Sequence, residues 1–193
     1  MTTTSIPVET VREFVIAGHA NLAQVKQMLD EMPSLLNMSY QWGENDWESA
    51  IQAASHLGNV SIVEYLLSKG APLEIYTAAM LGRIADIEAL LATDASLIKQ
   101  TGAHGIPILA HAAFNGDVEL FSYLISRGAE GGISYALHNA VVSGHVHLGK
   151  WILENTNPDL AWKNFERKTI LTVAMEQGNQ ELQELLRSRG APS

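Results

Sequence analysis

The apolar residues of this chain follow one pattern that occurs six times between about residue 7 and residue 191. In each copy, a segment rich in small residues is followed by a glycine. A second segment then carries apolar residues at helical spacing, as in Val60, Ile62, Val63, Leu66 and Leu67. Such spacing predicts an amphipathic helix with one apolar stripe. The pattern therefore predicts six helix–turn–helix units, centred on Gly18, Gly58, Gly82, Gly116, Gly144 and Gly178.

Each unit also carries residues suited to its turns and helix ends. The central glycine suits a tight or left-handed turn between the two helices. Asn59 and Asp117 follow central glycines, where a side-chain oxygen caps the second helix. One unit cannot bury its apolar stripe alone, so the units must stack. Close stacking is favoured by small residues in the first helices, among them Ala54, Ala78, Ala79, Ala112, Ala113, Ala140 and Ala174. Three second helices end at a C′ glycine, namely Gly70, Gly128 and Gly190.

These features resemble the ankyrin-repeat family in a divergent, bacterial-type form. The helix–turn–helix signature of that family reads T-P-L-H-x-A-A-x-x-G-H. Thr169 keeps the threonine, Leu137-His138-Asn139-Ala140 keeps the Leu-His-x-Ala step, and Gly18-His19 and Gly144-His145 match the Gly-His pair. The resemblance implies an all-α ankyrin-repeat solenoid of about six units with irregular hairpin connections, in a single array over residues 1–193.

The connections between units are uneven in length. The central glycines are separated by 40, 24, 34, 28 and 34 residues, whereas the period of the family is about 33. Ankyrin-type units place a projecting hairpin in the connecting segment. Segments 37–48, 99–106 and 155–168 are long enough for one. The connection between Leu67 and Leu73 has no room for a hairpin, and the one from Ile125 to Tyr135 has barely enough room. We therefore expect three long connections that alternate with two short ones.

The resemblance implies that a partner binds to the connection tips and to the exposed end of the first helices. The two positions before each central glycine are mostly apolar there, and a shared exposed apolar patch marks an interaction site. The alternative is that neighbouring units cover these side chains as ordinary core. The positions are Ile16/Ala17, His56/Leu57, Met80/Leu81, Phe114/Asn115, Val142/Ser143 and Glu176/Gln177.

The long connections add aromatic residues, a class enriched among binding hot spots. They include Tyr40, Trp42, Trp47, His104, Trp162 and Phe165. A tryptophan in such a loop can instead pack back on its own scaffold. The acidic residues Glu44, Asp46 and Glu48 are read as a solvated surface or, alternatively, as a docking site for a basic partner. The residues predicted to contact the partner are Trp42, Asp46, Trp47, His56, Leu57, Met80, His104, Phe114, Asn115, Phe165, Glu166 and Lys168.

Charge and composition narrow the partner class. The formal net charge is −9, which repels phosphate backbones and anionic membranes. We therefore expect no nucleic acid and no membrane partner, but a protein with a basic or apolar surface. The chain has no cysteine, no secretory signal pattern at its start and no membrane-length apolar run, so a cytoplasmic location is expected.

Catalytic and metal chemistry finds little support in the sequence. No G-x-S-x-G or H-E-x-x-H motif is present. Zinc needs three or four converging ligands. His138 and His145 match structural positions of the resembled family, which leaves His147 alone, and His104 and His111 lack a third ligand. No enzyme activity, metal ligand or cofactor is therefore expected, and a metal-dependent hydrolase using His138, His145 and His147 is kept as the alternative.

A second alternative is a structural scaffold that self-associates through the ends of the array. Polar residues occupy apolar stripe positions in the last helix and predict a polar cap there, namely Gln180, Gln183 and Arg187. Because a cap ends the array, a monomer is expected. The sequence as a whole predicts a non-catalytic module that binds a protein partner.

Overall fold

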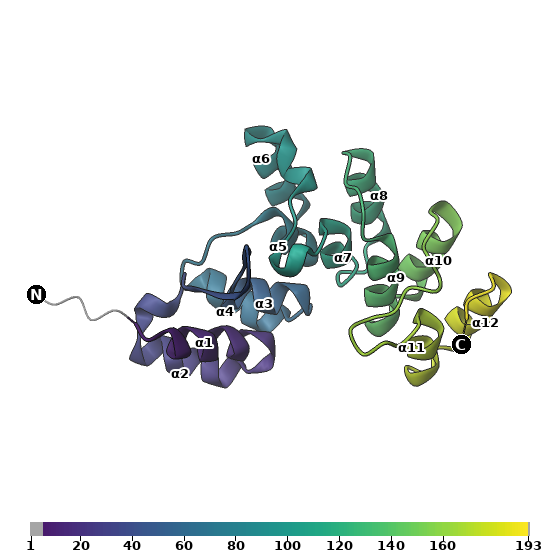
Figure 1. Cartoon of the computed structure of the whole chain (residues 1–193). Coiled ribbons are helices and arrows are strands. Elements are labelled where there is room, and N and C mark those ends of the chain that lie inside the picture. The colour runs from purple at the N-terminus through teal and green to yellow at the C-terminus, as the bar shows by residue number, and fades with distance from the viewer. Residues whose placement is uncertain (1–5, 193) are drawn as a thin grey trace, which may run out of the picture.

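The computed structural model describes residues 6–192. Twelve α-helices of this part of the chain form six pairs, and the pairs stack in chain order (Figure 1). The pairs are α1 (Val8–Ala20) with α2 (Leu22–Glu31), α3 (Ala50–His56) with α4 (Val60–Ser68), α5 (Ile75–Met80) with α6 (Ile84–Thr93), α7 (Ile108–Ala112) with α8 (Val118–Ser126), α9 (Ile133–Val142) with α10 (Val146–Asn155), and α11 (Ile170–Glu176) with α12 (Gln180–Ser188). The predicted all-α solenoid of helix–turn–helix units is confirmed. The boundaries of a single array over residues 1–193 stay a prediction.

The central glycines serve two different purposes. Gly58 has φ +69°, so it makes the left-handed turn that the sequence predicted. Gly18 differs, because it lies inside α1 and not in a turn. A Cβ atom on Gly18 would lie 2.6 Å from the backbone oxygen of Ala50. The prediction of a turn at Gly18 is therefore wrong, and that glycine instead lets α1 and α3 approach closely.

Of the two predicted N-cap residues, one caps its helix and the other does not. The Asp117 side chain accepts hydrogen bonds from the amides of Glu119 and Leu120, which confirms it as the N-cap of α8. Asn59 occupies the N-cap position of α4 but makes no side-chain cap bond. Its Nδ2 instead donates to the carbonyl oxygen of His19 at 3.1 Å, so this side chain ties two units together.

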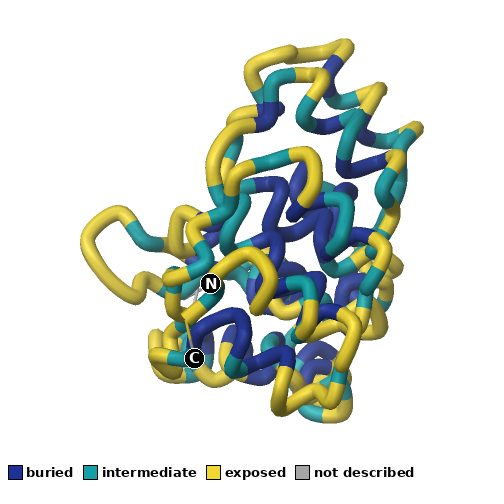
Figure 2. The backbone as a smooth tube through the Cα atoms, turned by 90° about the vertical axis from the view of Figure 1, so that its right-hand side faces the viewer, coloured by how far each residue is buried: buried dark blue, intermediate teal, exposed yellow. Residues whose placement is uncertain are grey.

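Two apolar cores run through the stack, and α5 contributes to both. Buried residues from α1 to α4, together with Met80 at the end of α5, form the N-terminal core. Ile75 at the start of α5 belongs to the larger core that continues through α12. The first-helix alanines named above are all buried, as their predicted role in close packing requires. Buried positions lie inside the stack and exposed positions follow its outer turns (Figure 2).

The three long and two short connections are confirmed, but the long ones differ from one another. The first forms an antiparallel hairpin of β1 (Ser39–Gly43) and β2 (Asp46–Ser49), with an irregularity between Gln41 and Gly43. The second is closed by one bridge between Thr101 and Pro107, and the third by one bridge between Lys163 and Thr169. Three short 3₁₀ helices complete the connections: η1 (Pro33–Leu35), η2 (Ala95–Lys99) and η3 (Ala103–Gly105).

None of the helices within residues 6–192 is long and apolar enough to cross a membrane.

Candidate functional site

A groove with a volume of about 370 Å³ opens where the ends of several first helices meet the third long connection. Units far apart in the sequence contribute to it, because stacking places equivalent positions of successive units side by side. Its lining comprises His56, Leu57, Phe114, Tyr135, His138, Asn139, Val142, Trp162, Asn164, Phe165, Glu166, Lys168, Val173, Glu176 and Gln177.

The apolar part of the groove is open to solvent. Leu57 and Val142 are exposed large apolar residues, and Phe165 is 88% exposed. Phe114 is half-buried and packs against the turn at Gly58, where an added Cβ would meet its ring. These side chains come from four different units, so a continuous apolar surface arises only in the stacked array.

One ammonium group joins two carboxylates at the edge of the groove. The Lys168 Nζ atom lies 2.8 Å from Glu166 Oε2 and 2.9 Å from Glu176 Oε2. The hydrogen bonds to Glu166 and then to Glu176 raise the pKa of Lys168 to about 12. The three charges together leave this edge of the groove with a net negative charge.

Hydrogen bonds and stacking hold the third connection beside α9. The two ring nitrogens of His138 lie 3.2 Å from Asn139 Oδ1 and 3.2 Å from Asn164 Nδ2. Asn164 Oδ1 in turn accepts a hydrogen bond from the Lys168 amide, and the Trp162 ring stacks on Tyr135 at 5.3 Å. Burial lowers the pKa of His138, against the hydrogen bond to Asn139 and the charge of Glu166. A neutral His138 therefore braces the connection, as its match to the family signature implies.

Six of the twelve predicted contact residues line the groove: His56, Leu57, Phe114, Phe165, Glu166 and Lys168. That these residues contact a partner stays a prediction. The sequence interpretation missed Tyr135, Asn139, Asn164 and Val173. The signal on α9 was nonetheless present, because Tyr135, His138, Asn139 and Val142 follow the i, i+3, i+4, i+7 spacing of one helix face.

The other six predicted residues lie outside the groove. Met80 is only 1% exposed and belongs to the N-terminal core, so the expectation of an exposed Met80 is wrong. Its short connection lets the neighbouring units cover it, which is the alternative raised above. Asn115 lies against the turn at Gly82. Trp47 is 53% exposed on the hairpin, and Trp42 is 37% exposed while its Nε1 donates a hydrogen bond to Glu48 on the same hairpin.

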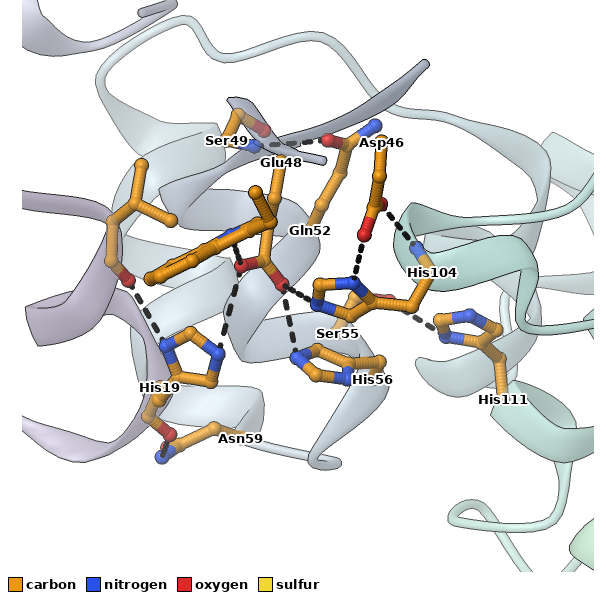
Figure 3. Close-up of polar contacts among 12 residues, drawn as sticks. His19, Asp46, Glu48, Ser49, Gln52, Ser55, His56, Asn59, His104 and His111 are labelled. Atoms are coloured by element: carbon orange, nitrogen blue, oxygen red, sulfur yellow. Dashed lines mark hydrogen bonds and ion pairs between the residues drawn. The ribbon is translucent and has the colours of Figure 1, made fainter. Parts of the chain in front are cut away.

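The remaining two residues, Asp46 and His104, belong to a cluster centred on Glu48 (Figure 3). Glu48 is fully buried, so the interpretation of Glu44, Asp46 and Glu48 as one solvated acidic surface is wrong for Glu48. Its Oε1 atom lies 3.0 Å from His56 Nε2 and 3.3 Å from His104 Nε2. Its Oε2 atom lies 3.6 Å from His19 Nε2.

Polar groups around the cluster hold the carboxylates of Glu48 and Asp46 in the ionised form. Burial raises the pKa of Glu48, but the hydrogen bond and charge of His56, the charge of His19 and the indole N–H of Trp42 outweigh it, and the pKa is lowered overall. The hydrogen bond from His104 holds the pKa of Asp46 below its ordinary value, against a smaller effect of burial. Two negative charges therefore lie beside three imidazole rings.

The histidines of the hydrolase alternative do not form such a cluster. His138 is engaged with the two asparagines described above, and His145 Nε2 lies 2.9 Å from the Phe114 carbonyl oxygen. His147 is exposed on α10. Within residues 6–192, one group of three or more histidine and acidic side chains is close enough to share a metal ion, and it comprises His19, Glu48 and His56.

A stack of helix pairs joined by connections of unequal length, with a groove across the ends of its first helices, defines a helical repeat solenoid. Family models for ankyrin repeats match residues 46–78 and, as three copies, residues 109–192. The chain belongs to the ankyrin-repeat family. A search of the curated proteins found no match.

Proposed function

We propose that this chain is a non-catalytic binding module whose groove holds a segment of a protein partner with an apolar anchor side chain flanked by basic residues. Ankyrin repeats are in general protein–protein interaction modules and are typically non-catalytic. The observation that carries the proposal is the exposure of apolar side chains from several units on one groove, above all Phe165.

The size of the groove favours a short segment over a broad flat surface. A volume of about 370 Å³ accepts one or two large side chains, which suits an anchor residue and its neighbours. Phe165 lies on the third connection, where His138 and Asn164 already fix the backbone. A connection whose backbone is already held loses little freedom on binding, and aromatic side chains are enriched among the residues that dominate binding energy.

Charge favours a basic flank on the partner. Glu166 and Glu176 share one cation, Lys168, so one negative charge at the groove edge is left over. The whole chain carries a net charge of −9. Such a field speeds encounter with a basic segment and opposes nucleic acid and anionic membranes as partners. The exposed polar residues Gln180 and Arg187 on α12 favour a monomer, because they give the array a polar end.

Selection from a displayed library of random peptides, followed by affinity measurement on the selected sequences, tests the proposal. We expect the selected peptides to share a bulky apolar residue beside Lys or Arg. Replacing Phe165 by Asp then weakens their binding at least about tenfold, because a central aromatic anchor contributes 2 kcal/mol or more.

Met175→Asp is the matched control for this experiment. Met175 is 50% exposed on the same helix as Glu176 but does not line the groove, so this variant should bind as the unmodified chain does. Both variants should keep the helical circular dichroism of the parent. Selection of acidic peptides, or equal binding by Phe165→Asp and Met175→Asp, would contradict the proposal.

A further inference from the structure

The histidine cluster at the N-terminal end of the stack lies in three separate parts of the chain. His19 lies near the end of α1, Glu48 lies on β2, His56 ends α3, and His104 lies on η3. η3 contacts β2 directly. Figure 3 shows the three imidazole rings gathered around the Glu48 carboxylate. His56 also lines the partner groove, but the other three side chains do not.

In His19 and His104, the hydrogen bond of the Nδ1 atom determines whether the Nε2 atom, which faces Glu48, can act as a ligand. His19 Nδ1 lies 3.1 Å from the Val15 carbonyl oxygen, which only accepts, so Nδ1 carries the proton. His104 Nδ1 lies 2.8 Å from the Asp46 carboxylate and carries its proton for the same reason. In the neutral form of both rings, the Nε2 atom then bears a lone pair. Both lone pairs face the carboxylate oxygens of Glu48.

The centre of the cluster leaves two buried polar atoms without a hydrogen-bond partner. Glu48 accepts one hydrogen bond with good geometry, from Trp42 Nε1 at 2.7 Å. Glu48 Oε1 and His56 Nε2 are buried and have no hydrogen-bond partner within the described residues, although they lie only 3.0 Å apart. A buried ring nitrogen and a buried carboxylate oxygen that lack hydrogen-bond partners are both satisfied when one cation lies between them. The two carboxylates of the cluster, Asp46 and Glu48, match the charge of one divalent cation.

We propose that His19, His56 and His104, each through Nε2, and Glu48 through its carboxylate bind one Zn²⁺ ion that ties the first, second and fourth units together. Three imidazole nitrogens and one oxygen are a full tetrahedral donor set for zinc. Bonds of about 2.0–2.1 Å place tetrahedral ligand atoms roughly 3.3 Å apart. Glu48 Oε1 lies 3.0 Å from His56 Nε2 and 3.3 Å from His104 Nε2, and Glu48 Oε2 lies 3.6 Å from His19 Nε2. The ligand atoms of His19, Glu48 and His56 all lie within 4.8 Å of one another, and His104 lies beside this group.

The surrounding groups complete the features of a metal site. Ligand histidines characteristically donate their second N–H to a carboxylate or a backbone carbonyl, which fixes the ring and makes it a stronger ligand. Asp46 does this for His104 and the Val15 carbonyl does it for His19. Because four protein groups fill the tetrahedron, no position is left for a substrate or a reactive water. The site is structural, which agrees with a non-catalytic module but does not depend on the groove.

Titration of metal-free protein without a histidine tag tests this site. Calorimetry should show one Zn²⁺ bound per chain, and Co²⁺ should give the intense visible absorption of a tetrahedral complex. Asp46→Asn keeps an acceptor beside His104 but removes its charge, and should weaken Zn²⁺ binding by about 10–100-fold. His104→Ala removes a ligand from a partly exposed position and should weaken binding further while leaving the helical content unchanged.

His147→Ala is the matched control, because it removes an exposed histidine outside the cluster. Its Zn²⁺ affinity should equal that of the parent. Zn²⁺ and Co²⁺ titrations without binding, or an equal loss of affinity in His147→Ala and His104→Ala, would overturn the site.

Discussion

Two ion pairs occupy the same register in two units, ten and two residues before the central glycine. The second unit has Glu48 and His56 there, 3.0 Å apart, and the sixth has Lys168 and Glu176, 2.9 Å apart. The first pair is buried beneath further histidines. In the second pair the Lys168 and Glu176 side chains are 35% and 50% exposed. The position of each pair is therefore set by the repeat unit, whereas its exposure to solvent is set by the neighbouring units.

The neighbours differ because the connections differ. Around the second unit, α1 packs against α3 on one side, and η3 from the second long connection contacts β2. Within the described residues no other helix pair covers the ion pair of the sixth unit, and both of its side chains are partly exposed at the edge of the groove. One end of the array therefore encloses a charged cluster, and the other presents charges and apolar side chains to solvent.

The largest expected difference between the two pairs is in stability. Glu48→Ala removes a buried carboxylate that contacts three imidazole rings and accepts the indole N–H of Trp42, which should lower the free energy of unfolding by about 3–5 kcal/mol. Lys168→Ala should change it far less, because water screens an exposed pair. Urea denaturation followed by circular dichroism measures both variants. Equal losses would show that burial does not distinguish the pairs.

Alanine substitutions in the turns next to the two pairs should differ less in their effect on the free energy of unfolding. Gly58 and Gly178 both have φ +69°, so an alanine is strained at either position. A Cβ on Gly58 would lie 2.6 Å from Phe114 Cδ1, whereas one on Gly178 would meet nothing within 4 Å. Gly58→Ala should therefore lower the unfolding free energy by about 1–3 kcal/mol more than Gly178→Ala. The same urea series checks this, and a larger loss for Gly178→Ala would contradict the packing described for Phe114.

The smallest expected effect concerns the histidine at the groove. His138 has a pKa below the ordinary 6.5 in the folded chain, chiefly through burial, although Glu166 and the hydrogen bond to Asn139 oppose the shift. Below about pH 6.5 the unfolded chain binds a proton that the folded chain resists, so stability falls as the pH falls. His138→Gln lacks this loss. The stability advantage of the parent over His138→Gln should therefore shrink from about pH 7.5 to pH 5, and a constant or growing advantage in urea midpoints would contradict a neutral His138.

Much of the fold was predictable because each unit carries its own signals. Apolar spacing, C′ glycines such as Gly128 and the Asp117 cap are local, and local patterns determine local structure. Half of the predicted contact residues line the groove for a related reason. Residues such as Leu57 and Phe114 could be predicted from their position in the sequence relative to a central glycine. Their predicted contact with a partner is untested.

Features that depend on neighbouring units escaped the sequence interpretation. Met80 looked exposed by its position in the unit, but the adjoining units cover it. Glu48 looked like part of a solvated acidic surface, but it is enclosed by residues from the first and fourth units. His19, His56 and His104 share no motif, because they lie 37 and 48 residues apart in the chain. Only the uneven connection lengths bring them together.

Hydrogen–deuterium exchange of the same protein with Zn²⁺ alone and with a groove-selected peptide alone tests the central claim, that the two ends of the stack hold different ligands. Exchange slows where a ligand stabilises the folded backbone. Zn²⁺ should protect segments 15–20, 39–55 and 101–106, and the peptide should protect segments 133–142 and 160–177; residues 56 and 57 border both sites and are left out of the comparison. Two separate footprints are the predicted result. A shared footprint, or a Zn²⁺ footprint on the groove alone, would contradict it.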